Sequence, residues 1–154
     1  MTPAEVTVEV SGLAVPRFNR HDMAAFARKV LRTLDSMKRL DREISEVSIG
    51  IVADSAMRSL NRGFRHINRT TDVLTFPADA SYGEPGDAGH PLGDIAISLD
   101  QARRQAAAER HAVGTEVRYL ILHGILHALG YDHESDAGEM NALEIEVRRR
   151  VGLE

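Results

Sequence analysis

The chain has 154 residues, the length of one ordinary domain, and its lack of cysteine excludes disulfides, thiolate metal sites and a cysteine nucleophile. Its net charge of −4 argues against nucleic-acid binding through bulk positive charge, so any such role must depend on a local basic patch. No apolar run is long enough to span a membrane and no signal peptide is recognisable at the N-terminus, so we expect a cytoplasmic protein without membrane contact.

The first half of the chain predicts two strands, each followed by a helix. Residues 7–10 alternate as a short strand would, and residues 20–39 place apolar side chains at helical spacing. Residues 46–53 form a β-branched run typical of a buried strand. Asp54 can then cap a helix that continues to about Phe64.

The second half predicts two further strands and three helices. The strands are expected at residues 73–76 and 94–98, and the glycine- and proline-rich stretch 77–91 between them predicts a mobile surface loop. A helix is expected over residues 99–110, and another starts at a Thr115 or Gly114 cap and ends at Gly130. The last helix should span residues 135–151.

The helix that ends at Gly130 is apolar around most of its circumference, which predicts a central position in the fold. With about four strands and five helices in one chain, the pattern indicates a single α+β or α/β domain over residues 1–154. Its sheet should be covered by the helices.

Three histidines lie in and just beyond this central helix, in the string HGILHALGYDH. His123 and His127 are four residues apart, so they share one helical face with Cβ atoms about 6 Å apart. Gly130 lets the chain turn, and His133 can then return towards the first two. We interpret the three imidazoles as ligands of one divalent ion, zinc in the first place and nickel as a possible substitute. Three ligands leave a tetrahedral position open for water, which is the pattern of a catalytic site.

The spacing of these histidines matches the extended zinc-protease motif H-E-x-x-H-x-x-G-x-x-H, with one difference. In such proteases the glutamate after the first histidine is the general base, whereas this chain has Gly124 there. Peptide hydrolysis is therefore disfavoured, unless Asp132 or Glu134 supplies the base from another direction.

A stripe of arginines precedes the third predicted strand. Arg58, Arg62 and Arg65 fall on one helical face, and Arg69 follows closely. Such a stripe can be a solvated helix face, or it can bind phosphate through its planar guanidinium groups. The spacing alone does not decide between these readings.

Three segments together resemble the YbeY family of bacterial proteins in their order and spacing. They are LNRGFRHINRTTDVLTFP at residues 60–77, LGDIAIS at 92–98, and the histidine string at 123–133. The likeness covers the chain from about Glu46 onwards, whereas the first 45 residues match only in their strand-then-helix pattern. The histidine string with its GYDH ending is highly specific to the family, and the segment TDVLTFP is nearly as specific.

The resemblance implies a metal-dependent endoribonuclease that cleaves single strands in the maturation of small-subunit ribosomal RNA and in ribosome quality control. It implies a mixed four-stranded sheet with helices around it. It places the metal, usually zinc, on His123, His127 and His133, and a functionally important arginine on Arg65. The implied partners are ribosomal RNA and the small subunit or its assembly factors, with neither DNA nor a membrane.

The mechanism expected from this resemblance is attack on phosphorus by metal-bound water or by an oriented 2′-hydroxyl, with Arg65 stabilising the developing charge. Asp132 and Asp94 are candidates for carboxylates that orient a ligand imidazole, or else serve as a turn residue and a strand-end cap. Glu139, Glu144 and Glu146 are expected to face solvent.

Two other functions compete with the nuclease. One is a zinc metalloprotease-like hydrolase, against which Gly124 argues. The other is a non-enzymatic ribosome assembly factor with a structural metal, which would require a fourth protein ligand.

Overall fold

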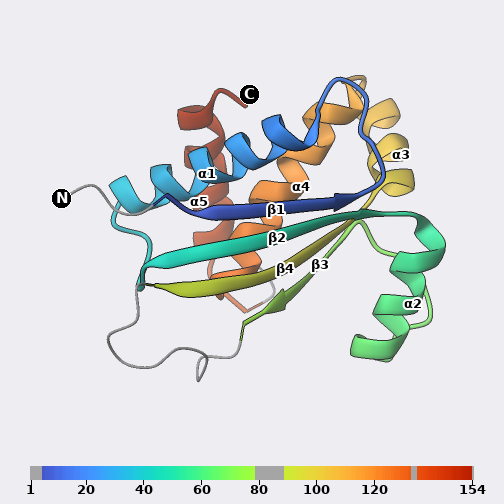
Figure 1. The fold of residues 1–154 in the computed structure, drawn as a ribbon, viewed down its shortest axis with the longest axis horizontal. Coiled ribbons are helices and arrows are strands. Elements are labelled where there is room, and N and C mark those ends of the chain that lie inside the picture. Colours follow the sequence, from blue (N-terminus) through green and yellow to red (C-terminus); the bar gives the residue numbers. More distant parts are fainter. Residues whose placement is uncertain (1–4, 79–88, 133–134, 154) are drawn as a thin grey trace.

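The computed structural model describes residues 5–78, 89–132 and 135–153, and within these ranges the chain forms four strands and five helices (Figure 1). Most of the predicted surface loop, residues 79–88, lies outside the described residues. The elements in chain order are β1 (Thr7–Gly12), α1 (Arg20–Ser36), β2 (Ile44–Val52), α2 (Asp54–Arg65), β3 (Val73–Pro77), β4 (His90–Ser98), α3 (Leu99–Glu109), α4 (Val113–Ala128) and α5 (Glu139–Val151).

The four strands form one mixed sheet in the order β1-β2-β4-β3. Strand β2 pairs in parallel with β1 and with β4, whereas β3 runs antiparallel to β4 and has no strand on its other side in the described part of the chain. The prediction of a single α+β domain with a mixed four-stranded sheet and five helices is therefore confirmed for the described residues.

The two faces of the sheet differ in chemistry because side chains alternate along each strand. Val10, Ile49 and Ile95 form one cross-strand row and belong to the core beneath α1, α4 and α5, which lie together on one side of the sheet (Figure 1). The preceding residue on each strand gives the row Glu9–Ser48–Asp94, which therefore points to the opposite face. On that face α2 packs its apolar side near β3 through Met57, Leu60 and their neighbours.

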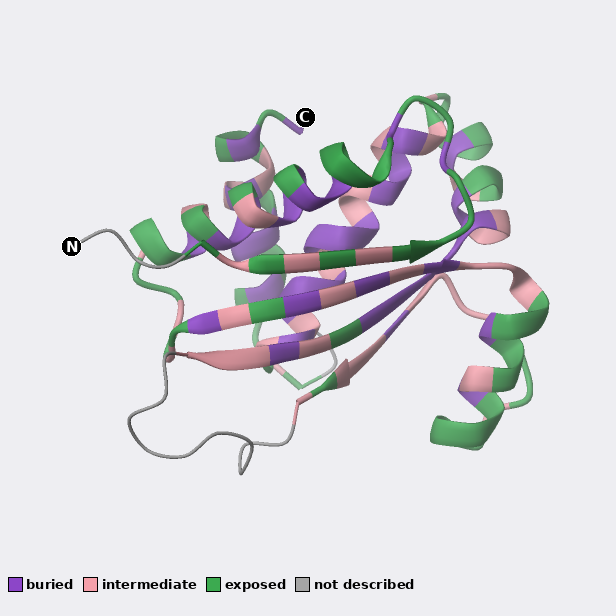
Figure 2. Ribbon diagram, viewed as in Figure 1, coloured by how far each residue is buried: buried purple, intermediate pink, exposed green. Residues whose placement is uncertain are grey.

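Helix α4 is the central helix, as its sequence predicts. Ten of its residues are buried, and the helix crosses behind the sheet with mostly buried turns (Figure 2). Gly124 faces the sheet so closely that a Cβ atom there would lie 2.7 Å from Cγ2 of Ile95. Within the described residues no helix combines the length and the apolar character needed to cross a membrane.

The starts of three helices differ from the prediction. Ala53, in extended conformation, is the N-cap of α2, and Asp54 lies in the first turn, where its carboxylate is used for tertiary contacts. Ala112 precedes α4, so neither Thr115 nor Gly114 caps it. Helix α5 begins at Glu139 because the segment before it forms a turn, in which Asp136 accepts a hydrogen bond from the Met140 amide (2.9 Å).

Candidate metal centre

The first two predicted metal ligands lie one turn apart on α4 and face each other. The Nε2 atoms of His123 and His127 are 3.0 Å apart, and their ring centroids are separated by 4.5 Å. The third predicted ligand, His133, lies outside the described residues, and among the residues that are described no group of three metal-ligating side chains occurs.

The geometry of this pair is compatible with a shared metal ion. With zinc–nitrogen bonds of roughly 2.0–2.1 Å, two tetrahedral nitrogen ligands are about 3.3 Å apart. The separation of 3.0 Å between the two Nε2 atoms is close to this value. Imidazole nitrogens are also ordinary ligands for zinc and nickel, so the donor chemistry agrees with the distance.

Glu144 orients one of the two imidazoles, and the prediction that it faces solvent is wrong. It is 5% exposed, and its Oε1 lies 3.1 Å from Nδ1 of His123. The apolar positions Leu143 and Val147 join the core, and this turns the adjacent carboxylate of α5 towards α4. A proton on Nδ1 that is donated to Glu144 leaves the lone pair of Nε2 directed towards His127.

The two aspartates considered as orienting carboxylates lie in different places. Asp132 lines the pocket in front of the histidines. Asp94 instead lies on the other face of the sheet, because the residue after it, Ile95, points to α4 and successive strand residues alternate. An orienting role for Asp94 at the imidazoles is therefore excluded by the tertiary structure.

A pocket of about 530 Å³ brings Arg65 together with His123 and His127. Arg65 is the last residue of α2, whereas the histidines belong to α4, and β3 forms the wall between these helices. The remaining lining residues are Thr71, Asp72, Val73, Leu74, Thr75, Gly130, Tyr131 and Asp132. Sequence separation alone could not show that this arginine and these imidazoles share a pocket.

Asp54 fixes the N-terminal end of α2. Its Oδ1 accepts hydrogen bonds from the hydroxyls of Ser98 (2.7 Å) and Thr70 (3.1 Å), and its Oδ2 pairs with Arg104 of α3. Burial raises the pKa of Asp54, but the hydrogen bonds from Ser98, Arg104 and Thr70 outweigh this effect and hold the pKa below its ordinary value. The ionised carboxylate therefore joins α2 to β4 and α3.

The C-terminal end of α2 is held by a second set of contacts. His66 adopts a left-handed conformation (φ 57°) and ends the helix directly after Arg65. The buried amide of Asn61 donates to the backbone carbonyl of Arg69 (2.9 Å), which folds the following segment back along the helix. These contacts fix the C-terminal end of α2 and therefore the position from which the Arg65 side chain reaches the pocket.

The other arginines of the predicted stripe do not line this pocket. Arg58 is exposed and donates from Nε to the side chain of Asn68 (3.0 Å). Arg62 and Arg69 are also exposed. Arg65 is also exposed, but of these four arginines it is the one that lines the pocket.

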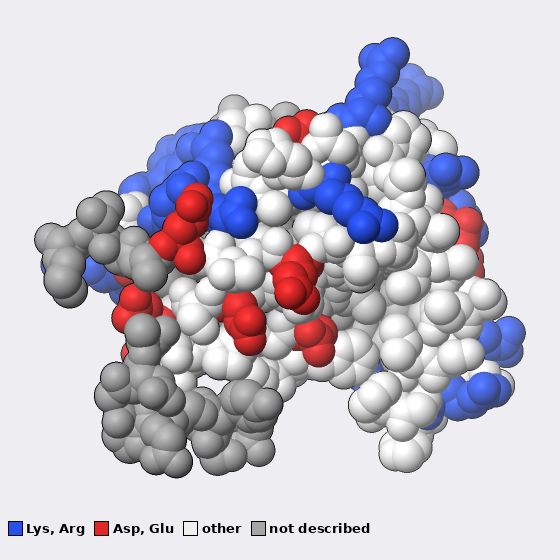
Figure 3. Space-filling view, viewed as in Figure 1, with Lys and Arg blue, Asp and Glu red and all other residues white. Residues whose placement is uncertain are grey.

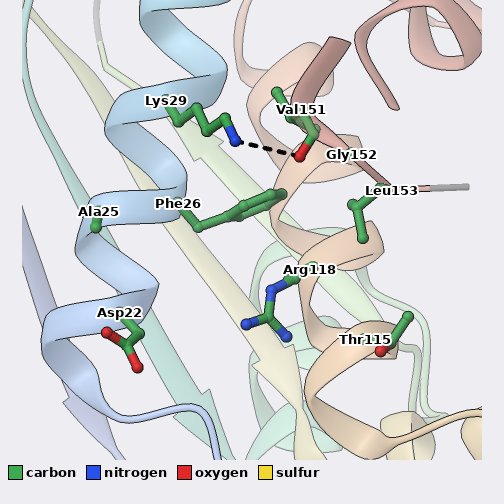
Figure 4. A pocket seen from close by; sticks show the side chains of 9 residues that line it. All are labelled: Asp22, Ala25, Phe26, Lys29, Thr115, Arg118, Val151, Gly152 and Leu153. Atoms are coloured by element: carbon green, nitrogen blue, oxygen red, sulfur yellow. Dashed lines mark hydrogen bonds between the residues drawn. The ribbon is translucent and has the colours of Figure 1, made fainter. Parts of the chain in front are cut away.

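A second hollow, of about 470 Å³, lies in the helical layer between α1, α4 and the end of α5 (Figure 4). There Lys29 Nζ donates to the Val151 carbonyl (3.4 Å), and Arg118 lies over the ring of Phe18 at 3.9 Å from its centroid. None of the residues predicted as ligands or as catalytic lines this hollow, so the candidate site is the pocket at the histidines.

These observations define a small α+β protein with a pocket that combines an imidazole pair and a guanidinium group. The fold is shared with the solution structure of TM1509 from Thermotoga maritima, at a TM-score of 0.59 and 23% identity over 94% of this chain and 89% of that one. A family profile described as Endoribonuclease YbeY matches residues 14–152.

Curated relatives agree with this match. A protein named Endoribonuclease YbeY from Anaeromyxobacter sp. is 43% identical over 139 residues, which cover 88% of this chain and 70% of the relative. One of the same name from Roseiflexus sp. is 35% identical over 99% of this chain and 98% of its own length. The chain belongs to the YbeY endoribonuclease family. It is therefore an enzyme that cleaves phosphodiester bonds in RNA. The family match also includes residues 14–45, for which the sequence analysis found a likeness only in the strand-then-helix pattern.

Proposed function

We propose that residues 1–154 form one metal-dependent hydrolase domain that cleaves single-stranded RNA during maturation and quality control of the small ribosomal subunit in the cytoplasm. His123, His127 and His133 hold one divalent ion, zinc in the first place and nickel as an alternative, and Arg65 is the catalytic arginine. The observation that supports this assignment is the shared pocket of Arg65 and the two described histidines.

The chain's own groups in this pocket suit phosphodiester chemistry. When bound, a divalent ion supplies a Lewis acid and helps to activate a water or a 2′-hydroxyl as nucleophile. The planar fork of Arg65 can bind two phosphoryl oxygens at once and stabilise the negative charge that develops on them during attack. Glu144 keeps His123 in one orientation, so the ligand shell is preorganised before RNA arrives.

The shape of the pocket favours a flexible strand as substrate. Helix α2 bounds it on one side and residues 130–132 on another, with β3 between the histidine helix and Arg65. A phosphate of an unpaired strand can enter this recess, whereas a stiff duplex would have to be deformed to do so. Single-strand specificity is therefore part of the proposal.

The net charge supports a role for partners in placing the substrate. Non-specific affinity for RNA depends largely on phosphate neutralisation by Lys and Arg, and this chain has a net charge of −4. The small subunit or an assembly factor would bring the RNA to the pocket and supply the affinity that the enzyme itself lacks.

The two alternative functions are less well supported. Gly124 stands where a zinc protease has its glutamate, and in this fold a side chain at position 124 would meet Ile95 and Val73 of the sheet. Membership in a family of endoribonucleases favours an enzyme over a purely structural assembly factor.

The proposal is tested by cleavage of a structured small-subunit ribosomal RNA fragment with tag-free protein. Arg65→Ala and His127→Ala, purified identically, are compared with the wild type, and metal content and thermal unfolding are measured for each. We expect both variants to lose cleavage, with Arg65→Ala still folded and loaded with metal. Equal cleavage by all three proteins would show contamination or an unrelated site and would refute the proposal.

A further inference from the structure

A third hollow lies on the face of the sheet opposite α4, on the side of β3 away from the histidines. It has a volume of about 430 Å³ and is lined by Ser11, Ser48, Ile49, Gly50, Leu60, Phe64, Phe76, Asp94, Ile95 and Ala96. Its floor is low because the cross-strand row Ser11–Gly50–Ala96 consists of small residues. A Cβ atom on Gly50 would meet nothing closer than Ser11 Oγ at 3.8 Å, so the fold itself does not require a glycine there.

An exposed aromatic ring forms one wall of this hollow. Phe64 is 67% exposed, the highest value among the large hydrophobic residues in the described ranges. Its ring packs edge-to-face against the ring of Phe76 on β3, at a centroid distance of 4.8 Å and an interplanar angle of 66°. The protein thus holds a flat apolar surface in solvent, an arrangement that a stacking ligand would stabilise.

The hollow and the metal pocket lie on opposite sides of β3, and the C-terminal end of α2 contributes a lining residue to each. Phe64 and Arg65 are consecutive on α2, so their side chains point about 100° apart around the helix, one into each hollow. Strand β3 separates the two hollows, with Leu74 and Phe76 in contact with α2 and its neighbours on one face and Val73 near α4 on the other. Since β3 is an edge strand in the described sheet, an RNA strand can pass around it from one hollow to the other.

The charges on this face suit a base better than a phosphate. Glu9 and Asp94 lie in one cross-strand row, and Figure 3 shows acidic side chains over the middle of the sheet, with Lys and Arg on the outer side of α2. Carboxylates repel the RNA backbone, whereas they accept hydrogen bonds from the N–H groups of base edges. The exposed Arg58 and Arg62 can hold the backbone on the outside of α2.

We propose that this hollow is a nucleobase subsite, which binds a base of the RNA next to the cleaved phosphodiester. Phe64 stacks on the base, and the carboxylate of Asp94 accepts hydrogen bonds from its edge. Guanine is the preferred base, because its N1–H and N2–H groups are adjacent donors that match the two oxygens of a carboxylate. The location of the subsite next to a cleavage site rests on the function proposed above.

Binding can be tested separately from cleavage by tryptophan fluorescence. The chain contains no tryptophan, so an introduced one reports on its own surroundings. Phe64→Trp places the single tryptophan of the chain in the hollow, and Ile145→Trp places it at an exposed position on α5 as the matched control. We expect saturable quenching by guanosine monophosphate in Phe64→Trp alone, and weaker binding of inosine monophosphate, which lacks the N2 amino group. Adding Asp94→Asn should abolish the difference between the two nucleotides. Equal, non-saturable quenching of both tryptophans would overturn the proposal.

Cleavage kinetics provide a second test. Phe64→Ala should raise KM for a short single-stranded RNA by about 5- to 150-fold and leave kcat nearly unchanged, as expected for the loss of one stacked base. Phe64→Tyr should restore KM, and Ile145→Ala should behave as the wild type. Unchanged KM in a folded Phe64→Ala protein would overturn the subsite and favour a protein partner at this face.

The two proposals can fail separately. If the wild type does not cleave RNA but Phe64→Trp is still quenched by guanosine monophosphate, the nuclease site is wrong and the base subsite stands. If the wild type cleaves RNA with a KM that is insensitive to Phe64, the nuclease site stands and the subsite is wrong.

Discussion

A carboxylate oxygen of Glu144 lies 3.1 Å from Nδ1 of His123, although 21 positions separate the two residues along the chain. The contact joins α5 to the histidine helix and buries the carboxylate, which is 5% exposed. A buried carboxylate requires a polar partner, and here an imidazole Nδ1–H meets that requirement. The same hydrogen bond fixes the orientation of the imidazole and makes its other nitrogen available to a metal.

Removal of this contact should weaken metal binding. We expect Glu144→Ala to lower the affinity for Zn²⁺ by about 10- to 100-fold, because His123 loses the partner that sets its tautomer and angle. Competition with a chromophoric chelator measures the affinity. Glu146→Ala is the matched control on the same helix, since Glu146 pairs with Arg149 and Arg150. An equal loss in both variants would mean that Glu144 acts only through helix stability.

Arg65 should not be replaceable by lysine. A lysine retains the charge but loses the planar fork that binds two oxygens of one phosphate, so we expect kcat of Arg65→Lys to fall by roughly 10²- to 10³-fold. Arg62→Lys, on the outer side of α2, should keep kcat within about twofold, because exposed charges couple weakly. Steady-state cleavage of the RNA fragment measures both, and wild-type kcat in Arg65→Lys would contradict the bidentate role.

Gly124 should tolerate no side chain without a loss of stability. Its Cβ would lie 2.7 Å from Cγ2 of Ile95 and 3.3 Å from Cγ2 of Val73. Overpacking of this kind costs about 1–3 kcal/mol, and the better helix propensity of alanine offsets at most about 1 kcal/mol. Denaturant unfolding of Gly124→Ala measures the net effect. Adding Ile95→Leu, which removes the Cγ2 methyl, should recover part of the loss, and no recovery would place the strain elsewhere.

The carboxylate of Asp54 should stabilise the fold in a pH-dependent way. Its pKa in the folded protein lies below the ordinary value of 3.8, so the contribution is complete above that pH. This stabilisation is lost as the pH falls through the pKa that Asp54 has in the folded protein. We expect Asp54→Asn to lower the free energy of unfolding by about 1–2 kcal/mol at neutral pH, since the charged partner of Arg104 is removed.

The pH profile provides the control for this assignment. The difference between wild type and Asp54→Asn should shrink as the pH falls below 3.8, when the wild-type carboxylate becomes protonated. Asp35→Asn, at an exposed position of α1, should differ little from the wild type at any pH. A difference for Asp54→Asn that stays constant down to acidic pH would show that packing, and not charge, is responsible.

The sequence by itself determined the class of fold, the family and the pair of facing histidines. Each rests on local regularities: alternation and helical spacing predict the elements, and a separation of four residues places His123 and His127 on one face of any helix. The family segments at 60–77, 92–98 and 123–133 are likewise contiguous strings. Helix starts were less accurate, because Asp54 can cap a helix locally but is used here to join separate elements.

Only the tertiary structure decided which residues from distant segments meet. Glu144 looked like a solvent-facing residue of an amphipathic helix, yet the packing of Leu143 and Val147 buries it against His123. From the sequence, Asp94 could be a carboxylate that orients a ligand imidazole or a cap at a strand end, and the alternation of β4 puts it on the opposite face, beside Phe64 and Phe76. The physical reason is that the periodicity of an element fixes the angles between its own side chains. Which of these faces lies inside is determined by the sum of contacts with the rest of the chain.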